Sequence, residues 1–303
     1  MTIKDTSNTL IVILGPTGIG KTNLSIKIAQ ALKTEIVSCD SRQMYRELKI
    51  GTAVPEPMQL ATVQHHFIGN LTIHDYYNAS KFESEALHVL NNIFKHTKYA
   101  VLTGGSGLYL DALVKGIDDL PTIDPNLREN LIKRLQTEGL EALQNELQKI
   151  DPDYYNLADL KNSKRVLKAL EVYYMTGKPY SVLRTEQVKP RPFKIIQIGL
   201  KMERAELYQR IDQRVDGMIK AGLVDEARKF YPYKQLNALN TVGYKELFGH
   251  FDGTYDLEEA IRLIKRNSRR YAKRQITWWN RDKNIHWFHP EQTAEILDFI
   301  HKS

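Results

Sequence analysis

LIVILGPTGIGKT, from Leu10 to Thr22, joins a short apolar run to a glycine-rich loop and the start of a helical pattern. The continuous apolar run Leu10 to Leu14 predicts a strand buried on both faces, as in parallel sheets. The next eight residues match G-x-x-x-x-G-K-[ST] in every fixed position, between a strand and a helix as that motif requires. Backbone N–H groups of such loops converge on phosphate oxygens. The motif predicts a diphosphate or triphosphate site formed by Gly15, Pro16, Thr17, Gly18, Ile19, Gly20, Lys21 and Thr22.

Polar side chains in and near this loop indicate which ligands and reactions it could support. Lys21 offers a point charge to the phosphates, and the Thr22 hydroxyl is a ligand for Mg²⁺, the expected metal. Enzymes that act on a γ-phosphate normally carry an acid at the end of an apolar strand, whereas the run Tyr99 to Leu102 ends in TGGSG. Asp40 is the acid at a strand end, where open α/β sheets bind ligands. It is expected near the loop as a helix cap, a magnesium-shell carboxylate or a general base.

Strand and helix patterns alternate around the motif and then give way to helices alone. This alternation predicts an α/β fold, a P-loop NTPase-like parallel sheet flanked by helices. An inserted all-helical subdomain is expected at 121–192, between the core segments 1–120 and 193–303. Strands are expected at Glu35–Cys39, Tyr99–Leu102 and Lys194–Leu200, and helices at Lys21–Leu32, Ala79–Phe94, Pro125–Leu135, Glu138–Lys149, Lys164–Thr176, Arg204–Ala221, Leu223–Phe230, Tyr244–Phe251 and Leu257–Trp279.

Composition excludes several classes of protein. The chain of 303 residues is 42% hydrophobic and 26% charged, as in globular proteins. No apolar run approaches the roughly 18–20 residues of a membrane span, and no secretion signal is evident, so no membrane partner is expected. The single cysteine, Cys39, fits a reducing cytoplasm and is expected to pack as a small apolar residue. No extra apolar stripe is evident, so we expect a monomer without an obligate protein partner.

Basic residues gather near the C-terminus. Between Arg262 and Lys283 there are nine Lys or Arg and one acid, Asp282, although the formal charge of the whole chain is only +7. Such clustering is typical of a polyanion-binding surface, or of a solvated helix face. Trp278 and Trp279 are expected to anchor the core more than to stack on bases. At helical spacing, a phosphate-tracking face would comprise Arg262, Arg266, Arg269 and Lys273, beside a face with Arg270 and Arg274.

Nine motifs, spread over almost the whole chain, resemble the tRNA dimethylallyltransferase (tRNA isopentenyltransferase) family in that family's order. The match is therefore far more specific than the phosphate loop alone. The motifs are GPTGIGKT at Gly15, DSRQMYRELKIGTAVP at Asp40, HHFI at His65, GGSGLYLDAL at Gly104, DPNLR at Asp124, KRVLKALEVYYMTGKP at Lys164, RIDQRVDGMIKAGLVDEA at Arg210, TVGYKEL at Thr241 and YAKRQITWW at Tyr271.

The resemblance implies transfer of a dimethylallyl group from dimethylallyl diphosphate to N6 of the adenosine at tRNA position 37, 3′ of the anticodon. The family acts on tRNAs that read codons beginning with uridine. The phosphate loop would hold the leaving diphosphate with Mg²⁺, so a water-activating acid is not required. By resemblance, Asp40 would accept the N6 proton, and Thr17 and Arg214 would contact the diphosphate.

The same resemblance implies contacts with the anticodon stem-loop of tRNA. Ser106 stands where the family usually has threonine, which keeps the hydroxyl. Before Lys164 the chain reads Asp159-Leu160-Lys161-Asn162, where many members carry His-Pro-Asn, so the local RNA contact is expected to differ. The implied tRNA-binding residues are Asp40, Ser41, Arg42, Gln43, Ser106, Arg128, Lys164, Arg165, Val166, Leu167 and Lys168.

Two other classes of function remain possible from the residues alone. A small-molecule or nucleotide kinase using ATP would explain the phosphate loop, but neither the basic helix nor the DSRQ segment. An RNA-binding module with a vestigial loop would not need the intact Lys21 and Thr22. His65 and His66 suggest a metal, but without a second ligand pair they fit the lining of a substrate pocket better.

Overall fold

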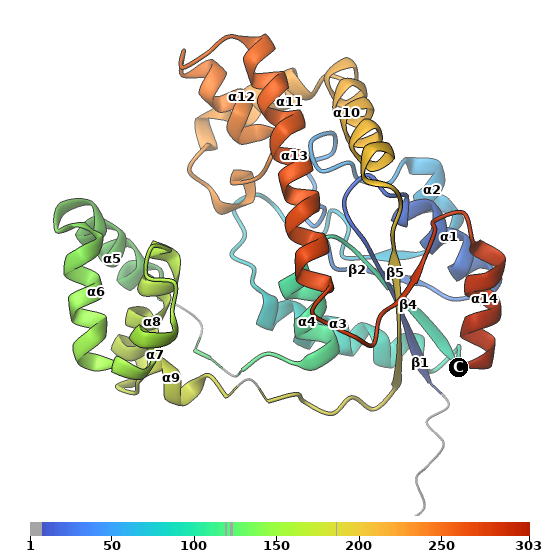
Figure 1. The fold of residues 1–303 in the computed structure, drawn as a ribbon, viewed down its shortest axis with the longest axis horizontal. Coiled ribbons are helices and arrows are strands. Elements are labelled where there is room, and N and C mark those ends of the chain that lie inside the picture. Colours follow the sequence, from blue (N-terminus) through green and yellow to red (C-terminus); the bar gives the residue numbers. More distant parts are fainter. Residues whose placement is uncertain (1–7, 119, 122–123, 186) are drawn as a thin grey trace, which may run out of the picture. The chain divides into compact units, whose positions relative to one another are not determined.

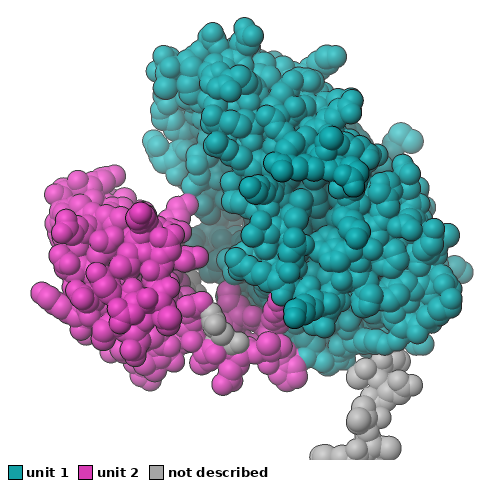
Figure 2. Space-filling model, in the orientation of Figure 1, with its two compact units in different colours: residues 1–114, 191–303 teal, residues 115–190 magenta. Residues whose placement is uncertain are grey.

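The fold is described from a computed structural model of the chain, covering residues 8–118, 120–121, 124–185 and 187–303. The chain divides into two compact units (Figure 2): residues 1–114 with 191–303, and residues 115–190. The first unit is called the core and the second the helical unit. The sequence placed the inserted segment at 121–192, so the unit begins six residues earlier and ends two residues earlier than the pattern suggested.

A parallel sheet forms the centre of the core (Figure 1), as the sequence predicted. The order of its strands is β3-β2-β4-β1-β5-β6, and every pairing is parallel. All six residues of β1 are buried, which explains its uninterrupted apolar sequence. The strands in the described residues are β1 (Thr9–Leu14), β2 (Ile36–Ser38), β3 (His65–His66), β4 (Tyr99–Thr103), β5 (Lys194–Leu200) and β6 (His286–Phe288).

Alternate residues of β1 enter two different apolar clusters. Leu10 and Val12 pack with α3 (Ala79–Ile93) and α4 (Gly107–Lys115). Ile11 and Ile13 pack with α1 (Lys21–Ala31) and α14 (Thr293–Lys302) on the other face. Side chains of a strand alternate between its faces, so this central strand joins both layers of helices. The phosphate loop follows β1 directly, and its Ile19 packs in the cluster with α1 and α14.

A second group of helices packs beside the carboxyl ends of the strands. Its cluster is centred on Tyr244, Leu247 and Ile264 and includes Tyr45 and Leu48 from the segment after β2. This group therefore lies over the edge of the sheet at which ligands are expected. Its helices are α10 (Arg204–Lys220), α11 (Leu223–Phe230), α12 (Tyr244–Phe251) and α13 (Leu257–Trp279), with short 3₁₀ turns at Tyr231–Tyr233 and Asn237–Leu239; α2 (Pro57–Thr62) lies after β2.

The helical unit has its own apolar core. Leu131, Leu143 and Leu147 are almost fully buried in it. Buried Asp151 accepts hydrogen bonds from the backbone N–H of Tyr154 at 3.0 Å and of Ser181 at 2.8 Å, and so ties two short helices together. The helices of this unit are α5 (Pro125–Thr137), α6 (Gly139–Ile150), α7 (Pro152–Leu157), α8 (Ser163–Thr176) and α9 (Tyr180–Leu183).

We predict that Leu143→Ala lowers the free energy of unfolding of the helical unit by about 2–5 kcal/mol, because it leaves a cavity at a fully buried position. Urea denaturation followed by circular dichroism measures this change. Leu157→Ala is the matched control, since Leu157 is 77% exposed and its loss should change stability by less than about 0.5 kcal/mol. Equal effects of the two substitutions would contradict the described core.

Candidate active site

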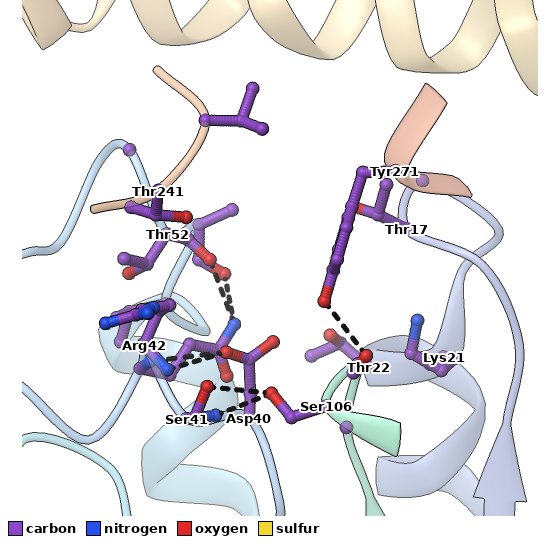
Figure 3. A pocket seen from close by; sticks show the side chains of 18 of the residues that line it. Thr17, Lys21, Thr22, Asp40, Ser41, Arg42, Thr52, Ser106, Thr241 and Tyr271 are labelled. Carbon is purple, nitrogen blue, oxygen red and sulfur yellow. Dashed lines mark hydrogen bonds between the residues drawn. The ribbon is translucent and has the colours of Figure 1, made fainter. Parts of the chain in front are cut away.

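A cavity of about 830 Å³ opens in the core at the carboxyl ends of β1, β2 and β4. The loops that follow these three strands line it, and α10 and α13 contribute further side chains. Figure 3 shows Thr17, Lys21 and Thr22 on one side of the cavity and Arg42, Thr52 and Thr241 on the other. Asp40 and Ser106 lie between these two sides. The cavity therefore brings the predicted phosphate loop and the predicted general base together.

The phosphate loop has the backbone that its sequence requires. Gly18 adopts φ +81°, and a Cβ there would lie 2.9 Å from the side chain of Ile211, so only glycine fits. Lys21 Nζ donates to the carbonyl oxygens of Gly15 at 2.7 Å and Pro16 at 3.0 Å. An anion entering the loop can replace these two acceptors. Thr17, Gly18, Gly20, Lys21 and Thr22 line the cavity, whereas Gly15, Pro16 and Ile19 are buried.

Positive charge in this part of the cavity is incompletely compensated. The Arg214 guanidinium donates to the Thr17 hydroxyl at 3.1 Å, so α10 brings a second cation to the loop. Burial, and then the nearby Arg214, lower the pKa of Lys21 to about 8. Burial also lowers the pKa of Arg214, against the attraction of Asp40. A bound anion would offset both effects, so the electrostatics favour a diphosphate or similarly charged group.

The Asp40 carboxylate is oriented by the turn that follows it. Its Oδ1 accepts the backbone N–H of Arg42 at 3.0 Å and that of Gln43 at 3.4 Å. Its Oδ2 accepts no hydrogen bond from the described part of the chain, and a Cβ at Gly105 would lie 3.2 Å from it. One oxygen therefore fixes the side chain, and the other is available to a ligand in the cavity.

Gln275 on α13 connects the two loops that flank Asp40. Its Oε1 accepts the backbone N–H of Thr17 at 2.8 Å, and its Nε2 donates to the carbonyl of Gly105 at 2.8 Å. The Tyr271 hydroxyl donates to the same carbonyl at 3.0 Å. Burial, with Asp40 nearby, raises the pKa of Tyr271, so its hydroxyl stays protonated.

The other predicted ligands of the extruded nucleotide also line the cavity. Ser41 and Ser106 share hydrogen bonds of 2.9 Å, which join the segment after β2 to that after β4. Arg42 donates to the carbonyls of Asn237 at 2.6 Å and Ala238 at 3.2 Å. Its guanidinium is thus partly engaged by the protein, while Gln43 also faces the cavity.

The remaining predicted tRNA ligands belong to the helical unit, and two of them need correction. Val166 is fully buried and Leu167 is 7% exposed, because the apolar face of α8 packs into the core of that unit. Their side chains cannot contact RNA in this structure. Lys164 and Arg165 are exposed. Half-buried Lys168 has its pKa lowered by burial, and Arg128 donates to the buried Glu171 at 2.7 Å.

The predicted basic face of α13 also needs correction. Arg262 pairs with Glu259 at 2.6 Å and Arg269 with Asp212 at 2.7 Å, so these two cations are neutralised within the protein. Arg270 and Lys273 are exposed and form no ion pair with any described residue, and Arg274 lines the cavity. The charge available to a polyanion therefore lies on Lys273 of the predicted face and on Arg270 and Arg274 of the neighbouring face.

The single cysteine, the tryptophan pair and the histidine pair differ in their burial and contacts. Cys39 is fully buried and Trp279 is 3% exposed, as predicted for core residues. Trp278 is 38% exposed and donates from Nε1 to Asp111. His65 lines the cavity, whereas His66 pairs with Glu35 at 2.6 Å.

Most of the residues that α13 and the segments 51–54 and 240–243 contribute to the cavity lining were not predicted from the sequence. Tyr271 and Gln275 lie in the quoted YAKRQITWW motif, at helical spacing, and could have been found from it.

The residues present fit a magnesium ion brought by a diphosphate. The Thr22 hydroxyl lines the cavity with the carboxylate of Asp40, and phosphate oxygens would complete an oxygen-rich shell. Within the described ranges no three His, Cys, Asp or Glu side chains are grouped as a metal site of their own. In the same part of the chain, no helix is both long and apolar enough to cross a membrane.

Comparison with known proteins identifies the class to which this fold and site belong. The family model of IPP transferase matches residues 43–282. A protein named tRNA dimethylallyltransferase 1 from Bacteroides fragilis is 55% identical over 98% of this chain and 99% of its own length, and one of that name from Phocaeicola vulgatus is 54% identical over 97% and 98%. The chain belongs to the IPP transferase family.

Solved structures agree with this assignment. The tRNA isopentenylpyrophosphate transferase of Bacillus halodurans has a TM-score of 0.71 at 36% identity and covers 97% of this chain and 96% of its own. A eukaryotic dimethylallyltransferase, solved acting on tRNA, has a TM-score of 0.77 at 25% identity, covering 97% of this chain and 80% of its own.

We predict that the affinity for dimethylallyl diphosphate falls as pH rises through about 8. The bound diphosphate favours protonated Lys21, whose pKa in the free protein is about 8, so binding weakens by up to about tenfold per pH unit above that value. Calorimetric titration at a series of pH values measures this. Lys21→Arg, which stays protonated, should bind with a flat profile; equal slopes in both proteins would contradict the assignment to Lys21.

Proposed function

We propose that the protein transfers the dimethylallyl group of dimethylallyl diphosphate to N6 of adenosine 37 in tRNAs that read codons beginning with uridine. One observation carries the proposal: Asp40 presents a carboxylate oxygen, free of hydrogen bonds from the described residues, in the same cavity as the phosphate loop. The names of the relatives agree with the reaction, and one similar structure is of a dimethylallyltransferase acting on tRNA.

The proposed reaction is a displacement at the allylic carbon. The lone pair of N6 forms the new C–N bond while the C–O bond to the diphosphate breaks, and the bonding pair leaves with the diphosphate. Lys21, Arg214 and the Thr17 hydroxyl stabilise the charge that develops on the leaving group. Asp40 Oδ2 accepts the proton from N6, which is a poor nucleophile because its lone pair is delocalised into the ring.

A magnesium ion bound with the diphosphate would supply further charge neutralisation. Thr22 is the residue we assign to hold it. The arrangement differs from that of an ATP-dependent kinase because β4 ends at Thr103 and is followed by Gly104, without an acid.

For the RNA, we assign a phosphate-binding surface to the exposed cations beside the cavity. Arg270 and Lys273 are available for phosphates, and Arg274 reaches the cavity itself. In the helical unit, Lys164, Arg165 and Lys168 are the corresponding candidates. Adenosine 37 must leave its stack to enter a cavity of this kind. A cytoplasmic, monomeric enzyme remains our proposal, consistent with a single buried cysteine.

We predict that Asp40→Asn lowers the single-turnover rate of transfer by about 10² to 10⁴ without changing the affinity for dimethylallyl diphosphate. Asparagine keeps the acceptor for the Arg42 and Gln43 N–H groups but cannot take the proton. Rapid quenching with radiolabelled dimethylallyl diphosphate and unmodified tRNA measures the rate. An unchanged rate would remove Asp40 from the chemistry, and label transfer from ATP to a small molecule instead would support a kinase.

We predict that Arg270→Ala reduces the slope of log K against log salt for tRNA binding by about 0.7 to 0.9, the loss of one phosphate contact. Arg269→Ala is the matched control on the same helix, because Arg269 already pairs with Asp212, and its slope should stay close to that of the unaltered protein. Filter binding over a range of salt concentrations gives both slopes. The reverse order would return the RNA surface to the face first predicted from the sequence.

A further inference from the structure

In the segment Lys49–Val54, residues Gly51–Val54 line the cavity across from the phosphate loop, and a single carboxylate fixes the backbone of Lys49–Gly51. Glu226 on α11 accepts the N–H groups of Lys49 at 3.0 Å, Ile50 at 2.9 Å and Gly51 at 2.9 Å. Figure 3 shows Thr52, which follows them, on the opposite side of the cavity from Lys21. Glu226 itself does not line the cavity, so any effect on a ligand must pass through this segment.

Tyr244, the first residue of α12, completes the arrangement. Its hydroxyl donates to Glu226 Oε1 at 2.6 Å, and the side chain is fully buried. Burial and the adjacent carboxylate raise the pKa of Tyr244, so the hydroxyl remains a donor. A Cβ at Gly51 would lie 2.6 Å from the tyrosine ring, so the ring packs directly on the backbone. Four donors therefore hold the carboxylate, and the segment cannot shift without breaking several hydrogen bonds.

The fixed segment in turn orients the side chain of Gln43. Gln43 Nε2 donates to the carbonyls of Thr52 at 3.1 Å and Ala53 at 2.9 Å, which uses both amide hydrogens. Its Oε1 accepts no hydrogen bond from any residue that the structure describes. Gln43 lines the cavity, and its backbone N–H contacts Asp40 Oδ1 at 3.4 Å. A ligand beside the Asp40 carboxylate thus meets a second acceptor whose direction the protein sets.

We propose that Glu226 is a positioning residue for recognition of the target base: by fixing Lys49–Gly51 it directs Gln43 Oε1 into the cavity as an acceptor for an N–H of adenine. This rests on the proposed function. Adenine has an exocyclic amino group with two hydrogens, of which one goes to Asp40 and the other can reach Gln43. A base with a keto oxygen in place of the amino group would set that acceptor against the acceptor oxygens of Asp40 and Gln43. A base without the amino group would leave Gln43 Oε1 unpaired.

The test measures a ratio of affinities. Anticodon stem-loops carrying either adenosine or purine riboside at position 37 are titrated against the full chain by fluorescence anisotropy. The unaltered protein should prefer adenosine, whose amino group donates to both Asp40 and Gln43; the hydrogen bond to Gln43 alone should account for about three- to tenfold of that preference. Glu226→Gln should lower the ratio by about this three- to tenfold factor, because its amide group opposes the backbone donors, while the contact with Asp40 remains. Asp225→Asn, an exposed acid one residue earlier on the same helix, should leave the ratio unchanged.

A second pair of variants keeps the proposal testable if the Glu226→Gln protein does not fold. Tyr244→Phe removes one donor and little volume, and should lower the ratio in part; Gln43→Ala should lower it by the full factor of about three- to tenfold. A folded Glu226→Gln or Tyr244→Phe protein that keeps the full preference would overturn the proposal, and so would a protein without any preference at the outset.

Affinity for dimethylallyl diphosphate, measured in parallel, should be unchanged in these variants. An unaltered protein that neither binds this compound nor labels tRNA would refute the proposed function, whatever the ratio.

Discussion

The buried amide of Gln275 is the interaction on which the site depends. It joins the backbone N–H of Thr17, in the phosphate loop, to the carbonyl of Gly105, in the loop after β4. Both ends of the amide are satisfied, and the side chain is 5% exposed, so the separation of the two loops is fixed. Asp40 approaches Gly105 from the neighbouring strand. A leaving group held by one loop and a base beside the other are thereby placed at a set distance.

The two sides of the cavity have opposite electrostatic character, which suits a transfer between a diphosphate and an amine. On one side, Lys21 and Arg214 lie close enough that burial and mutual repulsion lower the pKa of Lys21. Away from these cations, Asp40 in the middle of the cavity and Gln43 offer acceptor oxygens whose orientation depends on backbone hydrogen bonds. During transfer, negative charge develops on the leaving diphosphate and positive charge on N6. The cations and the acceptor oxygens therefore stabilise these charges more strongly as the reaction proceeds.

The sequence predicted the parts of the fold that rest on local pattern. The buried strand β1, the phosphate loop and the long amphipathic helices follow from residue order alone, and so does the placement of Asp40 at a strand end. Strands β3 and β6 were not predicted, because segments of only two or three residues carry no detectable periodicity. The cations of α13 could not be sorted from their spacing, because Arg269 is neutralised by Asp212, distant in sequence. Glu226 acts on backbone groups of a segment distant in sequence, and such groups leave no signature in that segment's sequence.

Prenyl transfer to N6 can be measured by mass spectrometry of nucleosides from unmodified tRNA after incubation with the protein, Mg²⁺ and dimethylallyl diphosphate. We expect adenosine 37 to gain one C₅H₈ unit on N6 and free diphosphate to appear in equal amount. No gain at this position, or a C₅H₈ unit on another atom or another nucleotide, would contradict this expectation.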